Sequence, residues 1–193
     1  MNDIDEHIKK YLLEFDEESD AILALEILLN FMRSAQKDKR YWVWVFISLH
    51  KSVQCFMVLA LQGTDSCRLL DSTKNSNKPN MYRFLELYSR IKNPEYMKQY
   101  TDSHEFQATA RQNRSIKLLN TELRNNFIHF SPKSWLIELA GMSTILVDCL
   151  DIIEFLALKA GNVFWNNKSE EQQLIKLLRN LRMNANRLRT IYG

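Results

Sequence analysis

An almost uninterrupted apolar run over residues 41–62 constrains the fold more than any other stretch of the chain. The run is long enough to cross a membrane as one helix, but His50, Lys51 and Gln54 lie at its centre. A second apolar run, residues 135–159, carries four acidic side chains. Because polar and charged groups are costly in the middle of a bilayer, both runs predict helices buried in a protein core, and no membrane partner.

Few helix-breaking residues interrupt the rest of the chain. Only 4 Gly and 3 Pro occur in 193 residues, whereas turn-rich β architectures need more of both. Apolar side chains recur at helical spacing, and the sequence has no alternating strand pattern, internal repeat or Gly-rich phosphate loop. We therefore predict one all-α domain over residues 1–193, a bundle of about six to seven helices.

Capping residues and breaks divide the chain into segments. Asp38 is expected to cap a helix that ends before Gly63, and residues 71–80, DSTKNSNKPN, are expected to form the one flexible loop. Asp102 and Glu105 have the spacing of a capping box. The expected helices cover residues 3–15, 20–37, 39–62, 81–91, about 103–124, 133–159 and 169–192.

Charge and cysteine usage limit the partners and the compartment. The net charge of +3 is too small to indicate nucleic acid by itself. The 3 cysteines lack framework spacing, which predicts free thiols in a reducing compartment. The acidic segment MNDIDEHIKK lacks the apolar stretch of a signal peptide, so we expect a cytoplasmic protein. Since His50, His104 and His129 have no metal-ligand spacing, neither a metal nor another cofactor is expected.

The stretch 119–135, LNTELRNNFIHFSPKSW, combines Arg124, His129 and the pair Asn125-Asn126. On an ideal helix five positions rotate two side chains by about 140°, so Arg124 and His129 converge only if the backbone changes course between them. The asparagines are poor helix formers, and Ser131-Pro132 is typical of the start of a new helix. A converging guanidinium and imidazole suit phosphodiester chemistry, because arginine stabilises phosphate charge and histidine transfers protons near neutral pH.

The motif RNNFIH resembles the R-x-x-x-x-H signature of the HEPN superfamily, all-α domains found in many prokaryotic toxins and defence ribonucleases. In that family a polar residue typically follows the arginine, as Asn125 does here. The resemblance implies a metal-independent endoribonuclease whose active site forms where two motif copies meet across a homodimer. It implies that Arg124 stabilises charge on the phosphate, that His129 is the general acid or base, and that Asn125 supports one of them.

The same resemblance implies RNA as the substrate and is compatible with a neutralising antitoxin or another regulatory protein. HEPN toxins paired with nucleotidyltransferase antitoxins often carry a tyrosine two residues after the histidine. Ser131 occupies that position here, so the resemblance does not extend to silencing by adenylylation of such a tyrosine.

A basic stripe precedes the motif on the same helix. Arg111, Arg114 and Lys117 fall within about 140° of one helix face together with Arg124. The stripe is a candidate RNA-binding track that would guide the backbone into the site. The alternative is that the stripe is an ordinary solvated face of the helix without a binding role.

Further polar and aromatic groups also have two interpretations. His50 and Gln54 lie one helical turn apart and could form a second wall of the site, although we favour a hydrogen-bonded core network. Core packing and a homodimer interface are favoured over base stacking for five aromatic residues, Trp42, Trp44, Phe46, Phe56 and Trp135. The basic C-terminal helix, residues 169–193, could bind an acidic partner or cover the bundle.

Two hypotheses stand beside the ribonuclease. In the first, the same fold binds RNA, a nucleotide or a protein without turnover, and salt-dependent RNA binding without cleavage would distinguish it. In the second, the chain is a structural helical dimer, and Arg124 and His129 point apart with local partners.

Overall fold

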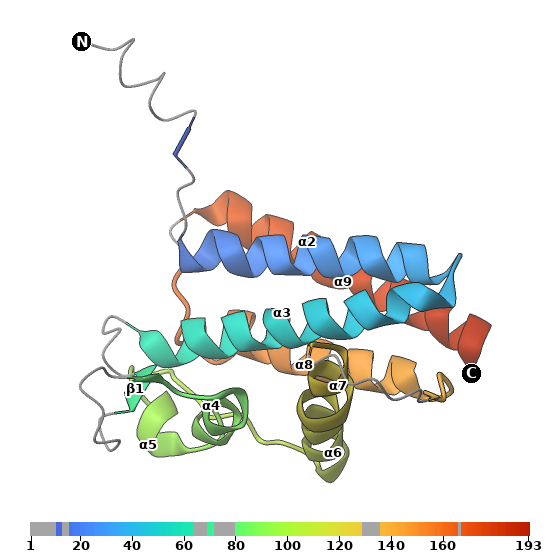
Figure 1. Ribbon diagram of the computed structural model, residues 1–193. Helices are drawn as coiled ribbons and strands as arrows, with labels where there is room; N and C mark the ends of the chain where they lie inside the picture. Colours follow the sequence, from blue (N-terminus) through green and yellow to red (C-terminus); the bar gives the residue numbers. More distant parts are fainter. Residues whose placement is uncertain (1–10, 13–15, 64–68, 72–79, 129–135, 166) are drawn as a thin grey trace.

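The chain folds into a bundle dominated by four long helices, and this fold confirms the predicted all-α class (Figure 1). The computed structural model describes residues 11–12, 16–63, 69–71, 80–128, 136–165 and 167–193. The long helices are α2 (Glu17–Ala35), α3 (Trp42–Gln62), α8 (Met142–Leu158) and α9 (Lys168–Tyr192). α2 contacts α3 and α9, and α8 contacts the same two helices, so the four enclose one core.

The shorter elements other than the connection between α2 and α3 lie beside α3 and α8, on the side away from α2 and α9 (Figure 1). α6 (Ala110–Leu118), the π-helical segment η3 (Leu119–Arg124) and α7 (Asn125–Ile128) follow one another without a break and cross beneath α3. The other short elements are η1 (Lys39–Tyr41), β1 (Leu70–Asp71), β2 (Asn80–Met81), α4 (Phe84–Arg90) and α5 (Pro94–Met97). β1 and β2 are antiparallel, and the predicted loop between them lies mostly outside the described residues.

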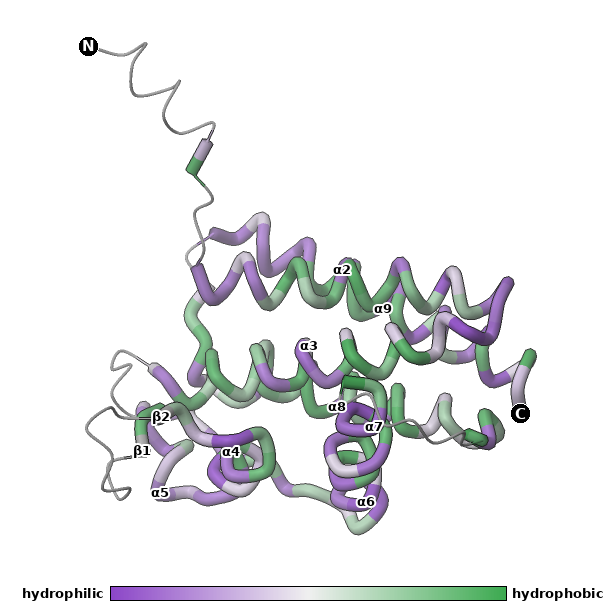
Figure 2. The backbone as a smooth tube through the Cα atoms, viewed as in Figure 1, coloured by the Kyte–Doolittle hydropathy of each residue, from purple (hydrophilic) through white to green (hydrophobic). Residues whose placement is uncertain are grey.

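The core is built around α3. Its fully buried side chains include Val45, Phe46, Leu49, Phe56 and Met57. Figure 2 shows apolar residues on the sides of the long helices that face one another. The segment Lys39–Gln62 has the length and the apolar composition to cross a membrane, but most of it is buried inside the bundle. That burial supports its interpretation as a core helix.

Several predicted boundaries are confirmed by the residues that form them. The Asp38 side chain accepts a hydrogen bond from the backbone N–H of Arg40, as expected of a cap. Gly63 ends α3 with φ of 55°, a conformation that favours glycine, and a Cβ there would lie 2.0 Å from Gln99 Oε1. Cys55 and Cys149 are free and buried, as predicted, while Cys67 lies outside the described residues.

Other predicted boundaries were wrong. The capping box lies at Thr109 and Gln112, not at Asp102 and Glu105, so α6 begins at Ala110. The helix does not end near Arg124 but continues to Ile128, because packing of the half-buried Phe127 against Phe46 outweighs the weak helix propensity of the asparagines. The expected helix 3–15 and the Ser131-Pro132 start lie largely outside the described residues.

The long helix α8 also begins later than predicted. Residues 136–140 are not helical, and α8 starts only after Gly141, which has a left-handed φ of 80°. In the middle of the chain, α4 begins later than predicted, at Phe84, but ends at Arg90 with Ile91 as its C-cap, as predicted, and Asn93 then caps the short helix α5. The apolar spacing typical of a helix therefore began before the first residue that is helical in the folded chain.

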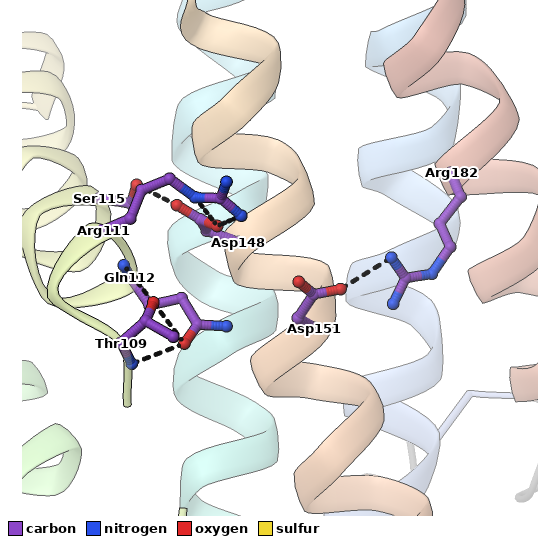
Figure 3. Close-up of polar contacts among 7 residues, drawn as sticks. All are labelled: Thr109, Arg111, Gln112, Ser115, Asp148, Asp151 and Arg182. Carbon is purple, nitrogen blue, oxygen red and sulfur yellow. Dashed lines mark hydrogen bonds and ion pairs between the residues drawn. The ribbon is translucent and has the colours of Figure 1, made fainter. Parts of the chain in front are cut away.

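A buried carboxylate joins α6 to α8 (Figure 3). Asp148 is fully buried, and its carboxylate accepts hydrogen bonds from Arg111 Nε at 2.9 Å and from Ser115 Oγ at 2.7 Å. One helical turn further on, Asp151 forms an ion pair with Arg182 of α9 at 2.8 Å. The two pairs leave α8 in different directions and attach it to α6 and to α9 (Figure 3).

The Asp148 pair should contribute measurably to stability. Arg111→Met keeps the aliphatic stem but leaves the carboxylate with Ser115 as its remaining side-chain donor. We expect the free energy of unfolding to fall, because the buried Asp148 carboxylate loses its cationic partner, although water screens part of the pair at the 59% exposed Arg111 side chain. The matched control Arg114→Met, exposed on the same helix, should change it by less than about 0.5 kcal/mol. Urea denaturation followed by circular dichroism measures both, and equal losses would contradict the expectation.

Candidate functional site

The π-helical segment η3 divides its side chains between the core and an open cleft. Leu119 and Leu123 are buried in the core. Asn120 and Arg124, each one position further along, are half-buried and line the cleft. π-helical turns accommodate an extra residue and are frequent at functional sites. The widened turn therefore places an amide and a guanidinium next to each other at the cleft while two leucines hold the segment in the core.

The cleft around Arg124 has a volume of about 480 Å³ and three walls. One wall is the helix that carries Arg124, and the second is α3, which contributes His50 and Gln54. The third wall is the start of α4, where Arg83 is exposed. The complete lining consists of His50, Gln54, Arg83, Phe84, Leu85, Glu86, Asn120, Arg124 and Asn125. Two guanidinium groups, three amides and one carboxylate make this a cleft suited to an anion.

Arg124 is oriented by its neighbour in the chain. Its Nη1 donates a hydrogen bond to Asn125 Oδ1 at 2.9 Å, and both side chains are half-buried. A guanidinium has five N–H groups in a fixed plane, so this bond leaves others to point toward a ligand in the cleft. The supporting role that the HEPN resemblance implies for Asn125 stays a prediction.

His50 is part of the cleft wall and is also tied into the core. Its ring stacks on Phe84 with centroids 3.9 Å apart, and its Nε2 lies 3.0 Å from Asn120 Oδ1. Only 6% of the residue is exposed. His50 is therefore hydrogen-bonded to Asn120, and it lines the cleft together with Gln54.

Burial makes His50 a neutral group. The pKa of His50 is lowered to about 4, mainly by loss of hydration and in part by the Arg124 charge, while the hydrogen bond with Asn120 opposes the shift. At neutral pH the imidazole is uncharged, and a proton on Nε2 would match the oxygen of Asn120. His50 is thus an uncharged partner of Asn120 in the wall of the cleft.

The other predicted site residues that the structure describes do not line the cleft. His129 lies outside the described residues, so its distance from Arg124 stays a prediction. Arg111 forms an ion pair with Asp148 and borders a different cavity, between α8 and α9. Arg114 and Lys117 are exposed on α6. The structure therefore brings Arg124 and Asn125 together in the cleft and places Arg111 against α8.

Comparison of the chain with protein-family models, with curated protein sequences and with solved structures finds no significant match. The site must therefore be interpreted from its own geometry. That geometry adds Arg83 and Asn120, which sequence reasoning missed. Asn120 lies four positions before Arg124 and could have been found from that spacing. Nothing in the sequence places Arg83 near them, because α4 is brought to the cleft by the tertiary fold.

The buried His50 should make stability depend on pH. Its pKa is lowered on folding, so the unfolded chain binds more protons between about pH 6.5 and pH 4. The contribution of His50 to the free energy of unfolding is fully present above this window and is lost as the pH falls through it. At pH 5 the loss from this residue is about 2 kcal/mol. In urea unfolding at pH 7 and pH 5, His50→Gln should lack this component and the exposed control His104→Gln should keep it. The same pH response in both variants would contradict the assignment.

The proximity of Arg124 and His50 can be tested directly. Because the Arg124 charge lowers the pKa of His50, Arg124→Gln should raise that pKa. An NMR titration of the imidazole resonances measures the change. Arg187→Gln removes the same charge from an exposed position on α9 and should leave the His50 pKa where it is. An unchanged pKa in Arg124→Gln would place the guanidinium away from the ring.

Proposed function

We propose that this protein is a metal-independent endoribonuclease of HEPN type, with its active site in the cleft around Arg124. The observation that carries the proposal is that cleft: Arg124 is held half-buried by Asn125 in an open groove that contains a second guanidinium, Arg83. Such a groove offers several N–H donors to one phosphate group. The resemblance of RNNFIH to the HEPN signature adds His129 as the proton-transfer group.

In the proposed reaction the ribose 2′-oxygen attacks the adjacent phosphorus and loses its proton to a base. The bond from phosphorus to the 5′-oxygen breaks, and the leaving oxygen takes up a proton. Arg124 stabilises the charge that develops on the phosphoryl oxygens, and Asn125 orients the guanidinium. His129 transfers the proton, because His50 has too low a pKa for this task near neutral pH. The products are a 2′,3′-cyclic phosphate and a 5′-hydroxyl.

The proposal includes a homodimer in the cytoplasm, in which two copies of the motif face a shared groove. RNA is the proposed partner, with Arg114 and Lys117 as exposed cations on the helix leading to the cleft. Arg111 can add to that track only through the N–H groups that Asp148 leaves available. A neutralising protein is compatible with a cleft of this kind, since it could cover Arg124.

A second candidate function is binding without turnover. The observation that favours it is the low pKa of His50. Among the described residues that line the cleft, His50 is the histidine. Without a proton-transfer group, the two arginines and the amides would hold an RNA phosphate or a nucleotide and leave it intact. In that case Arg124 would be required for binding and His129 would not be required for any reaction.

Cleavage of RNA in the presence of EDTA tests the proposal. We expect the full chain to cut single-stranded RNA, and Arg124→Ala and His129→Ala each to lower the rate by at least about 100-fold. Asn125→Ala should have a smaller effect, because it removes an orienting contact only. Arg187→Ala is the matched control for loss of one arginine and should keep full activity.

The same variants separate the two candidates. Salt-dependent RNA binding that requires Arg124, with no cleavage by the unaltered chain, would establish the binding function instead. Full cleavage by His129→Ala would remove the HEPN-type mechanism. Circular dichroism of each variant checks that the helical fold is kept.

A further inference from the structure

A small cavity of about 90 Å³ lies where α6, α8 and α9 meet. Three helices supply its polar lining: Arg111 comes from α6, Ser143 and Thr144 from the first turn of α8, and Asn186 and Arg189 from α9. None of these residues lines the cleft around Arg124. The cavity is therefore a site separate from the proposed active site.

Ser143 is the buried polar residue of this cavity. It is 4% exposed, and its hydroxyl has no hydrogen-bond partner among the described residues. Unlike Trp42 Nε1 and Asn162 Oδ1, which are unpaired and closed to solvent, this hydroxyl remains accessible, and the residue borders the cavity. Buried polar groups are normally paired, so an accessible unpaired hydroxyl at this place indicates a ligand.

The start of α8 adds a backbone donor. The residue at its cap is Gly141, so no side chain caps this 17-residue helix. The N–H groups of Met142 and Thr144 donate to backbone carbonyls, and the oxygen of Gly193 accepts from the N–H of Gly141. The N–H of Ser143 has no acceptor in the part of the chain that the structure describes. A free N–H and the partial positive charge of a helix start favour an anion.

The arginines of the lining supply further donors. Arg189 is exposed and forms no ion pair with a described residue. Arg111 donates through Nε and Nη2 to Asp148, and its Nη1 points away from that carboxylate (Figure 3). The described lining contains no carboxylate of its own. Because Asp148 balances Arg111, the net positive charge at the cavity comes from Arg189 and the start of α8.

The size of the cavity and its donors together indicate the class of ligand. The volume of about 90 Å³ is well below the roughly 300 Å³ of the smallest pockets for drug-sized molecules, so it admits a single small group. The donors converge from three helices and not from one plane. A tetrahedral anion with several acceptor oxygens matches this arrangement, and phosphate is the anion that arginines and helix starts commonly bind.

We propose that this cavity binds a phosphate group. The hydroxyl and the N–H of Ser143 donate to its oxygens, and Arg189 and Nη1 of Arg111 balance its charge. A free phosphate monoester and a phosphodiester of RNA carry the same group, and the experiment separates these two sources. In the second case, which rests on the proposed function, the RNA backbone contacts α6 at Arg111, about 20 Å along the helix from Arg124.

Two-dimensional ¹H–¹⁵N NMR of the full chain tests the proposal, because it observes this cavity separately from the cleft. Inorganic phosphate should shift the amide resonances of Ser143 and Thr144 in a saturable way, and sodium chloride of equal ionic strength should not. Arg189→Gln should weaken binding at least about 10-fold, as expected for loss of a charged hydrogen-bond partner. Arg187→Gln removes an exposed arginine of the same helix that does not line the cavity, and it should keep the affinity.

A smaller change tests the buried hydroxyl itself. Ser143→Ala removes the hydroxyl, keeps the backbone N–H and leaves the charge of the site unchanged. The affinity for inorganic phosphate, measured at the amide of Thr144, should fall at least about 3-fold. The dispersion of the same spectrum shows that each variant is folded.

A second titration separates the two sources of the phosphate group. Its probe is a 2′-O-methylated oligouridylate without a terminal phosphate, which lacks the attacking hydroxyl, and it is added to Arg124→Gln to weaken binding in the cleft. Shifts at Ser143 with inorganic phosphate alone identify a free phosphate monoester. Shifts with the oligonucleotide alone identify an RNA backbone, and shifts with both show that the site accepts either source.

Three results overturn the proposal. They are unchanged Ser143 and Thr144 resonances with both probes, equal shifts with chloride, and equal affinities of Arg189→Gln and Arg187→Gln. Phosphate binding at Ser143 does not require cleavage of RNA. Failure of the ribonuclease proposal therefore leaves this one standing, and the reverse also holds.

Discussion

The burial of α3 is the constraint on which the rest of the structure depends. This helix touches α2 and α8 along its length, and it also touches η3 and α4. A helix that is apolar on most sides must be covered on most sides, so its neighbours are arranged around it. Among its polar residues, His50 is accommodated by its contact with Asn120, and both His50 and Gln54 border the cleft. The position of the cleft therefore follows from the packing of the core helix.

Much of the fold was predictable because local chemistry determines it. Asp38 and Gly63 mark the limits of the segment that contains α3, through a side-chain cap and a left-handed backbone conformation. The sequence also showed that polar groups in the middle of an apolar run argue for a core helix. These inferences succeed because capping and burial depend on a few neighbouring residues.

Other features were not predictable because distant residues determine them. The sequence suggested a helix from residue 133, but α8 begins at Met142, after the left-handed Gly141. The asparagines after Arg124 suggested a helix end, yet the stacking of Phe127 on Phe46 continues the helix. At the site, the neighbours Arg124 and Asn125 were identified from the motif. Arg83 was missed because it reaches the cleft from another element.

The π-helical segment has a consequence for how the cleft tolerates changes in chain length. An extra residue in a continuous α-helix rotates all later side chains by about 100°, whereas a π-helical turn takes up the extra residue within the turn. The segments on either side of η3, α6 and α7, therefore keep the relative orientation of one continuous α-helix. Deletion of one residue in this segment would regain regular α-helical geometry without turning α7. The side chains within the turn, Asn120 and Arg124 among them, would change direction, so a length change here acts on the cleft and not on the helix that follows.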